Sequence, residues 1–525
     1  MSSQEGIRFW LLSLILAGLS VFPIWQGPAS ELIGAGPDVV STVWGMWWFQ
    51  KESAAFLSST HSTLANYPNG VIGVVLAPSA ALSWAWLEPI VGEAQALRLA
   101  VSIQIWGLIA GVVAIAQQLT NNKWAALMGG LALCTGRYLY FSVGEASLVA
   151  IAAIPLVWGL FLCVRFEKRA HILTALGLVL CTLWTALENP YLAPILPMVL
   201  LVVSALKGFK KERKMAAWLL GTAIVGLLGL MWVASLFKGA ANPDYPREVA
   251  GQWVSMLGRR WEIIDLPWAR LSWWTVAWPE PLNWTVGIDD ARQASGGRYL
   301  GLSVVALGLF GLVREHHWRW LALGGISYAL ALGSVHFGLS GLFLFVNGVM
   351  DAIARPLTQP TRFVLVLQVV LVLGVASTAH VVLQKKWQYG ALLAAILLGD
   401  ALAVGGLSLR IPTSVLPQVE CALEGPVLIW PHDAQDGAQS QSQLYQISHE
   451  QPSPHTAIAS WAVSGERTIN ALRAAGFRLD SRRVQLNRLR QLGYRSIIVV
   501  DEVPVWADEG RLAACGSLRV LDLGD

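Results

Sequence analysis

The sequence predicts a polytopic α-helical membrane protein with about twelve membrane-spanning helices, followed by a small C-terminal soluble α/β domain. Of its 525 residues, 55% are hydrophobic and only 13% are charged, and the mean hydropathy is +0.53. Soluble domains carry roughly a quarter charged residues, so water-soluble cores could not hide this much apolar surface. Residues 1–410 carry 27 Lys and Arg against 20 Asp and Glu (net +7), whereas 411–525 carry 10 Arg, no Lys and 13 acids (net −3). This change divides the chain into a membrane domain, 1–410, and a tail domain, 411–525.

The membrane domain contains apolar segments of the length that a spanning helix needs, about 20 residues. They are 9–26, 71–91, 96–118, 123–142, 145–164, 170–187, 190–207, 215–237, 299–314, 319–337, 362–384 and 388–408. The connections 27–70 and 238–298 are expected to be outer loops. No small-x-small cleavage site follows the first segment, so it is predicted to be an uncleaved helix and not a signal peptide.

The Lys and Arg bias of the short loops predicts the orientation. The basic clusters are Arg165/Lys168/Arg169, Lys207/Lys210/Lys211/Arg213/Lys214, Arg314/Arg319 and Lys385/Lys386. The order of the predicted spans allows all four clusters to face the cytoplasm. The long loops and the tail then lie on the outer side. Five predicted spans precede Arg165, an odd number, although Arg8 should also lie inside. Either 71–91 does not cross the membrane, or 38–57 contains a further crossing.

Tryptophan is unusually common, with 26 copies, and is crowded at Trp44, Trp47 and Trp48 and again between Trp253 and Trp284. One interpretation is the aromatic belt at the headgroup level. The other is that some of the rings form stacking platforms for sugars or lipid chains.

The tail has the pattern of a small α/β domain. The runs 427–430 and 496–500 are predicted to be buried strands, 519–521 a third strand, and 466–492 a helix with Arg on its polar face. Cys421 and Cys515 bracket this domain, and in an extracytoplasmic compartment they are candidates for a disulfide.

Several classes of function have no support in the sequence. It contains no phosphate-binding loop, dinucleotide glycine pattern, CxxC pair, HExxH or GxSxG motif, which leaves ATP-driven transport and metal chemistry without a basis. It also contains no basic tract interleaved with aromatics, so no nucleic-acid partner is expected. No metal ligands are assigned, and one candidate acid is too few to infer whether a divalent metal is needed.

Asp38 is the first candidate for chemistry, because it follows Gly36-Pro37 directly after the first predicted span. An acid at the edge of a lipid-facing cavity is able to act as a general base on an acceptor hydroxyl. The alternative is that Asp38 only caps a helix beginning at Val39.

The arrangement resembles the GT-C superfamily of integral-membrane glycosyltransferases, and most closely its large bacterial members that end in an extracytoplasmic α/β domain. The resemblance covers nearly the whole chain and rests on short motifs. These are Gly36-Pro37-Asp38, Tyr67-Pro68-Asn69-Gly70, Arg298-Tyr299-Leu300-Gly301-Leu302, and Arg355-Pro356 with Thr361-Arg362-Phe363.

The resemblance implies that Asp38 is the catalytic base and that the donor is a polyprenyl-phosphate-linked sugar; no other cofactor is implied. The sequence departs from the family at two places. Pro37-Asp38-Val39 has one acid where many relatives have two, and Gly144-Glu145-Ala146-Ser147 stands where relatives often have a His-x-Asn cluster.

Arg355 and Arg362 flank a Pro-rich turn in a predicted outer stretch. A guanidinium matches phosphate oxygens, so the pair is a candidate clamp for the lipid phosphate. The alternative is that they pair with lipid headgroups or with Asp351. Glu145, Glu188 and Tyr191 lie next to predicted spans on the outer side and are secondary candidates for lining the same cavity. The alternative is that the two acids simply lie in the membrane interface, where a charge costs little.

The leading hypothesis is a transferase in the bacterial inner membrane, part of the cell-envelope machinery, that moves a sugar from a polyprenyl phosphate to a glycan, lipid or protein acceptor on the extracytoplasmic face. A flippase or transporter for a lipid-linked glycan is the runner-up, although the internal repeats common in transporters are missing. The third hypothesis is a non-catalytic membrane assembly protein, which the two departures from the family favour.

Overall fold

The structure is a computed structural model. It describes residues 3–34, 37–51, 60–62, 71–73, 77–144, 151–168, 171–240, 252–256, 259–263, 299–333, 346, 360–417, 419–430, 446–448, 451, 486–500, 512–516 and 518–523. The remaining residues, Glu145 and Arg355 among them, lie outside the described part of the chain.

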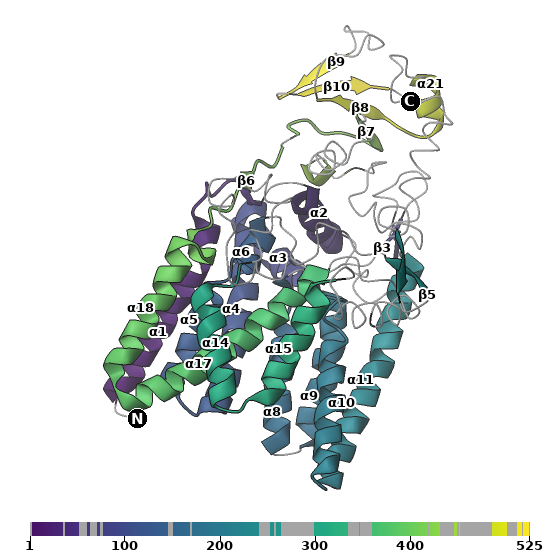
Figure 1. Ribbon diagram of the computed structural model, residues 1–525. Helices are drawn as coiled ribbons and strands as arrows, with labels where there is room; N and C mark the ends of the chain where they lie inside the picture. The colour runs from purple at the N-terminus through teal and green to yellow at the C-terminus, as the bar shows by residue number, and fades with distance from the viewer. Residues whose placement is uncertain are drawn as a thin grey trace.

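The membrane domain is a bundle of apolar helices (Figure 1). Its helices are α1 (Ser3–Val21), α2 (Pro37–Lys51), α3 (Pro78–Val91), α4 (Glu93–Thr120), α5 (Lys123–Leu133), α6 (Arg137–Gly144), α8 (Ile154–Lys168), α9 (Ile172–Glu188), α10 (Ile195–Phe209), α11 (Arg213–Ala240), α14 (Leu302–Arg314), α15 (Trp318–Ala331), α17 (Val364–Lys385) and α18 (Trp387–Ala403). Short 3-10 helices are η1 (Phe22–Trp25), η6 (Pro360–Phe363) and η7 (Gly406–Ser408).

Among the described residues, four stretches are long and apolar enough to cross a membrane: Ile7–Trp25, Glu93–Thr120, Arg213–Val233 and Thr361–Lys385. Shorter apolar helices accompany them, and large hydrophobic side chains such as Trp10 and Leu228 are exposed on the outer surface of the bundle. Apolar groups that face outward in this number need lipid around them. The chain is therefore a multi-pass membrane protein.

Helix α17 is the centre of the bundle. Every residue from Val364 to Ala379 is buried, and the helix packs against α4, α5, α14 and α15. The approach to α14 is close because three glycines face each other there. A Cβ added at Gly374 would collide with the carbonyl oxygen of Gly308, and one added at Gly311 would collide with that of Gly374. Small residues at helix crossings are typical of membrane bundles, where close backbone packing drives association.

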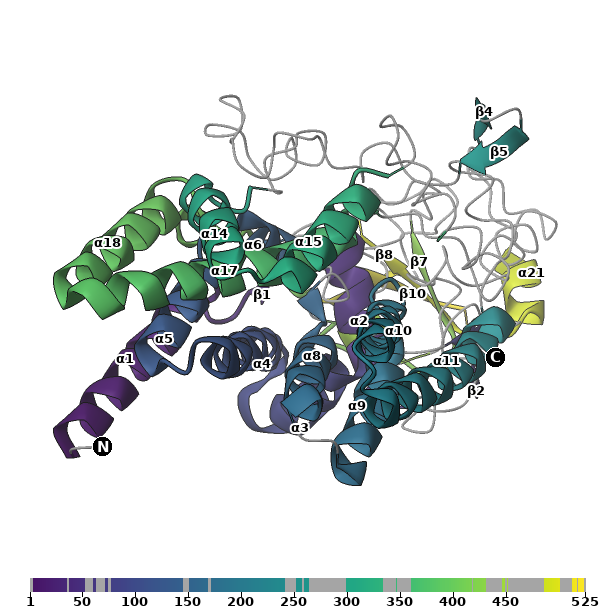
Figure 2. The same ribbon diagram turned by 60° about the horizontal axis from the view of Figure 1, so that its bottom comes forward.

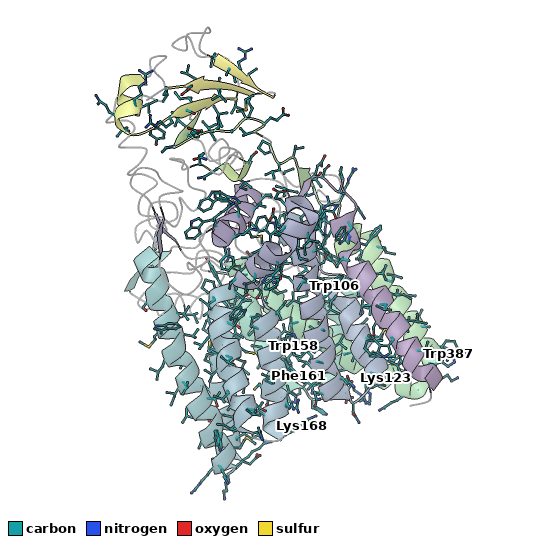
Figure 3. All side chains as sticks on the ribbon, turned by 180° about the vertical axis from the view of Figure 1, so that it is seen from behind. Trp106, Lys123, Trp158, Phe161, Lys168 and Trp387 are labelled. Carbon is teal, nitrogen blue, oxygen red and sulfur yellow. A yellow bond between two sulfur atoms is a disulfide. The ribbon has the colours of Figure 1, made fainter. Side chains whose placement is uncertain are left out.

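The basic loops share one end of the bundle, as the sequence pattern predicts. The α10–α11, α14–α15 and α17–α18 connections all lie at the end opposite the C-terminal sheet (Figure 1). Lys123, Lys168 and Trp387 lie toward this same end (Figure 3). Here Arg319 forms an ion pair with Glu167 and so links α15 to α8.

Two predicted spans are wrong in their extent. The segment 71–91 begins with strand β3 (Val71–Gly73), which pairs with β2 (Thr60–Ser62), and its helix α3 begins only at Pro78. Both ends of α3 lie at the sheet-facing end, because Ser79 contacts the last residue of α9 and one residue separates α3 from α4. The segment 123–142 is divided into α5 and α6 by a turn after Leu133.

The tail contains a four-stranded mixed sheet in the order β7-β8-β10-β9. Its elements are β7 (Val427–Trp430), the short helix α21 (Leu486–Gln491), β8 (Ser496–Val499), β9 (Leu512–Cys515) and β10 (Leu518–Asp522). Strand β7 pairs parallel with β8, and β10 pairs antiparallel with both β8 and β9. Three strands confirm the prediction, whereas β9 was missed because Leu512-Ala513-Ala514-Cys515 carries little β-branched character. Of the predicted helix 466–492, only the end is described, as α21.

Apolar residues cover both faces of this sheet. Leu428, Ile497 and Leu521 pack on one face with Leu489 of α21, and Ile429, Ile498 and Val520 pack on the other. All four residues of β8 are buried, which explains why the sequence has a continuous apolar run there instead of an alternating one.

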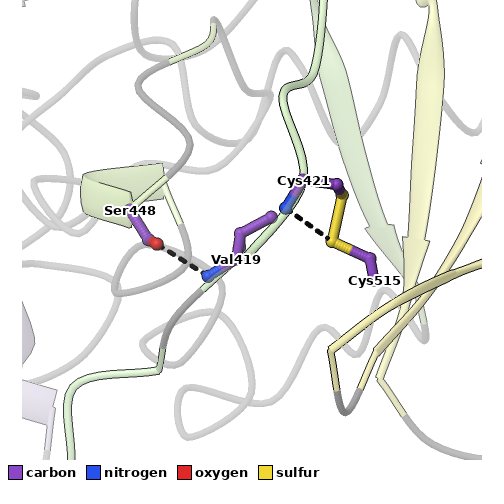
Figure 4. The surroundings of a disulfide bond; sticks show 4 residues. All are labelled: Val419, Cys421, Ser448 and Cys515. Carbon is purple, nitrogen blue, oxygen red and sulfur yellow. Dashed lines mark hydrogen bonds between the residues drawn. A yellow bond between two sulfur atoms is a disulfide. The ribbon is translucent and has the colours of Figure 1, made fainter.

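Cys421 and Cys515 form a disulfide in the structure, with Cα atoms 5.4 Å apart, and it joins the segment before β7 to the end of β9 (Figure 4). The amide of Cys421 donates to the Cys515 sulfur at 3.1 Å, and the amide of Val419 donates to the Ser448 hydroxyl at 2.7 Å. The segment that leaves the membrane domain is therefore fixed to the sheet at Cys515 and to a second part of the tail at Ser448.

Candidate functional site

The candidate site is the end of the bundle that faces the C-terminal sheet, where α2 and α3 lie (Figure 1). Asp38 is the second residue of α2, with Pro37 at the first helical position. Proline is favoured there, and an acid in the first turn interacts well with the helix dipole. Because the helix begins before Asp38, the prediction that Asp38 caps a helix starting at Val39 is wrong. The side chain of Asp38 is outside the described part, so its chemical role stays a prediction.

The chain just before Asp38 is held by Arg98 of α4, which is only 1% exposed. Its guanidinium donates to the carbonyl oxygens of Gly27 (3.0 Å), Glu31 (3.1 Å) and Pro28. It also lies 6.0 Å from the ring centre of Trp25. A buried arginine is costly unless it is hydrogen-bonded, and three carbonyls on one turn accept from its two terminal nitrogens, whereas its Nε is buried without a partner in the described part of the chain. Arg98 is not recognisable from the sequence, because nothing local distinguishes it from a residue at the membrane interface.

A strand from the start of the tail holds the same loop. Strand β1 (Leu32–Ile33) pairs antiparallel with β6 (Thr413–Ser414). The amide of Gly34 donates to Pro412 at 2.7 Å, and the Ser414 hydroxyl donates to the Gly34 carbonyl at 2.7 Å. The backbone leading to Asp38 is thus anchored by residues that lie about 380 positions later.

The tryptophans of α2 are neither a belt nor an open stacking platform. Trp44 and Trp48 are fully buried and stack on each other, with ring centres 5.8 Å apart and planes inclined by 7°. The Trp44 indole donates to the side-chain oxygen of Gln446, in the tail, at 2.9 Å. These rings form a packed contact between the first outer loop and the tail, so both interpretations are wrong for them. Trp253 to Trp284 lie almost entirely outside the described residues.

Glu188 is the last residue of α9 and is completely buried. Its Oε1 accepts from the Ser79 amide at 2.7 Å, from the Trp184 indole at 2.8 Å, and from the Ser79 hydroxyl. Residue Ala77, the N-cap of α3, has a left-handed backbone (φ 53°) and no capping side chain. Glu188 therefore provides, from another helix, the acceptor that the first turn of α3 needs.

Arg362, in η6, lies against Tyr191, in the turn between α9 and α10. Its guanidinium carbon is 4.4 Å from the ring centre of Tyr191, and both side chains are 8% exposed. The amide of Tyr191 donates to the Asn189 side chain at 3.2 Å, which fixes the turn. The structure therefore gathers three predicted residues, Glu188, Tyr191 and Arg362, around one connection. Asp351, the predicted alternative partner of Arg362, is outside the described residues.

A second buried polar group orders the beginning of α14. Tyr299 donates to Asp400 of α18 at 2.6 Å, and the other carboxylate oxygen accepts from the amide and the hydroxyl of Ser303. Asp400 thus serves as the acceptor for the first turn of α14. The sequence motif around Tyr299 has a structural role here, and Asp400 was missed because its partners lie about 100 residues away.

Within the described part of the chain, no group of three or more His, Cys, Asp or Glu residues is arranged to hold a metal ion.

Comparisons with known proteins identify the fold. No known protein family and no curated protein match this sequence. The structure is similar to a mutant of the arabinofuranosyltransferase AftD from Mycobacteria, with a TM-score of 0.52 and 13% identity over 98% of this chain and 41% of that one. It is also similar to ArnT from Cupriavidus metallidurans bound to undecaprenyl phosphate, with a TM-score of 0.48, 12% identity, and coverage of 100% and 99%. The chain thus spans about two fifths of the length of AftD. The predicted resemblance to the GT-C glycosyltransferases is confirmed as a likeness of fold.

Proposed function

We propose that the protein is a membrane glycosyltransferase that moves a sugar from a polyprenyl-phosphate donor to an acceptor on the extracytoplasmic face. The Asp38 carboxylate takes the proton of an acceptor hydroxyl as its oxygen attacks the anomeric carbon of the sugar. The bond between that carbon and the phosphate oxygen breaks, and the lipid phosphate leaves with the electron pair. Arg355 and Arg362 stabilise the charge that develops on the phosphate.

The observation that carries this proposal is the fold, which matches a sugar-transferring membrane protein along 98% of the chain. Fold alone does not decide function, so the local arrangement matters as well. The loop before Asp38 is fixed by Arg98 and by β6, and α2 packs on α3, whose first turn is held by Glu188. Arg362 lies on Tyr191, three residues after Glu188. This chain of contacts connects the helix of the proposed base to one member of the proposed phosphate clamp.

The proposed orientation follows from the same architecture. If α2, α3 and α6 stay at the outer end, the described helices α1, α4, α5, α8, α9, α10, α11, α14, α15, α17 and α18 give eleven crossings, close to the predicted twelve. Four of them then precede Arg165, so the parity conflict in the sequence disappears. The basic loops face the cytoplasm. The tail, with its disulfide, faces the oxidising side of a bacterial inner membrane.

The test is donor turnover by purified full-length protein in lipid nanodiscs, with a panel of polyprenyl-phosphate sugars. Release of the free lipid phosphate is followed for the wild type and for Asp38→Asn, which keeps the side-chain shape but removes the base. Loss of about 100-fold or more in turnover is expected for Asp38→Asn. Glu93→Gln is the matched control, because Glu93 lies in the first turn of α4 and its side chain makes no hydrogen bond or ion pair within the described part of the chain.

The alternatives give different results in the same assay. Donor binding without turnover by the wild type would indicate a flippase for a lipid-linked glycan. Neither binding nor turnover by folded protein would indicate a non-catalytic assembly protein. Equal turnover by the wild type and Asp38→Asn would remove Asp38 from the mechanism.

A further inference from the structure

The membrane-facing side of α9 and α11 contains an apolar groove of about 420 Å³. Ile172, Ala175, Leu176 and Val179 of α9 form one wall, and Ala217, Trp218, Gly221, Thr222 and Val225 of α11 form the other. Figure 2 shows these two helices side by side. Thr222 is the only lining residue with a polar side chain apart from the Trp218 indole, so the groove suits a hydrocarbon chain.

The groove lies along the flank of the contact between α9 and α11, near the basic end of the bundle. Farther along α11 the two helices are tightly packed: a Cβ added at Gly226 would meet Thr182 at 3.4 Å, and one at Gly229 would collide with Leu183. At Gly221 an added Cβ would meet nothing within 4 Å. The groove runs along the first half of both helices, from Ile172 to Val179 of α9 and from Ala217 to Val225 of α11.

Exposed cations stand at the open end of the groove. The α10–α11 connection and the start of α11 carry Lys210, Lys211, Arg213 and Lys214, all exposed. The ion pair described in this connection joins Lys207 to Glu212 at 2.8 Å and involves none of these four. Arg213 precedes Ala217 and Gly221 by one and two turns along one face of α11, and Lys214 precedes Trp218 in the same way. The charges of Arg213 and Lys214 are therefore in line with the apolar groove, and Lys210 and Lys211 lie in the connection just before them.

We propose that this groove binds an anionic phospholipid of the surrounding leaflet, with one acyl chain between α9 and α11 and the headgroup phosphate at Lys210, Lys211, Arg213 and Lys214. The length from Lys214 to Val225 is about 16 Å along the helix, which matches the extended part of an acyl chain within one leaflet. A zwitterionic lipid fits the apolar groove equally well but gains less from four cations. The combination selects for net negative charge. This site depends on membrane embedding and not on the transferase activity.

The test uses native mass spectrometry of the full-length protein in detergent, with phosphatidylglycerol or phosphatidylethanolamine added at equal concentration. The wild type is expected to retain phosphatidylglycerol about ten-fold more than phosphatidylethanolamine. Gly221→Phe fills the groove and is expected to lower phosphatidylglycerol retention by about ten-fold. The control is Gly325→Phe on α15, because Gly325 also has open space around it and is exposed.

A second variant, in which Lys210, Lys211, Arg213 and Lys214 are all changed to Gln, tests the charge separately. This variant is expected to retain the two lipids equally, each at the level at which the wild type retains phosphatidylethanolamine. Equal retention of the two lipids by the wild type would overturn the proposal. Unchanged phosphatidylglycerol retention in Gly221→Phe would also overturn it, and so would stronger retention of polyprenyl phosphate than of phosphatidylglycerol by the wild type. A protein dimer that Gly221→Phe separates would overturn it as well, since the groove would then hold a second copy of the chain.

Discussion

Two substitutions of Glu188 distinguish whether this residue holds the first turn of α3 in place or transfers a proton in the reaction. In Glu188→Leu the Ser79 amide loses its acceptor at 2.7 Å, and no other acceptor for it is present in the described part of the chain. The Trp184 indole keeps a hydrogen bond, because it also donates to the Ser79 hydroxyl at 2.9 Å. The Ser79 hydroxyl loses the same acceptor, so two donors are orphaned. At about 2 kcal/mol for a buried donor the cost is about 2 to 4 kcal/mol, and the similar size of Leu adds little to this.

Glu188→Gln is expected to behave differently. Gln has a carbonyl oxygen in the position of Oε1, so it still accepts from Ser79 and Trp184. It also places an amide where Oε2, buried and without a hydrogen-bond partner, stands in the wild type. We expect Glu188→Gln to unfold at the wild-type temperature and to keep its activity, whereas Glu188→Leu unfolds several degrees earlier.

The measurement is thermal unfolding in nanodiscs followed by tryptophan fluorescence, together with donor turnover of each variant. The control pair is Glu315→Gln and Glu315→Leu, at an exposed acid after α14, where a change within about 0.5 kcal/mol is expected. A folded Glu188→Gln variant that loses turnover by about 100-fold would refute the positioning role and make Glu188 a proton-transfer residue. Equal stability of the Leu and Gln variants would refute the capping of α3.

Two further predictions concern topology and packing. Cysteines introduced as Glu212→Cys and Ser440→Cys in a cysteine-free background should react with a membrane-impermeant maleimide from opposite sides of the membrane. The reason is that the basic loops and the tail lie at opposite ends of the bundle. Labelling of both cysteines from the same side would contradict the proposed orientation. Gly374→Leu should cost about 3 kcal/mol and sharply lower the yield of folded protein on size-exclusion chromatography, because its side chain collides with the backbone of α14. Gly325→Leu, in open space, should fold normally, and equal yields would contradict the close α14–α17 packing.

Part of the fold and of the site is predictable from local patterns. Continuous apolar runs predicted most helices of the bundle and three strands of the tail, because the length and spacing of apolar residues report directly on a lipid or core environment. The α3 segment is the instructive error. Its hydropathy is that of a spanning helix, but a strand at Val71–Gly73 and the contact of Ser79 with Glu188 keep both of its ends on one side.

The sequence by itself determined the membrane class, the common end of the basic loops and three of the four strands of the tail sheet, and it named Glu188, Tyr191 and Arg362 among several candidate residues. Only the tertiary structure decided their partners. Arg98 reaches a loop about 70 residues earlier, Ser79 meets Glu188 across 109 residues, and Trp44 meets Gln446 across 402. The hydropathy of a segment predicts only how apolar its surroundings are. The acceptor for a given buried donor depends on which helices pack together, and that is a property of the whole chain.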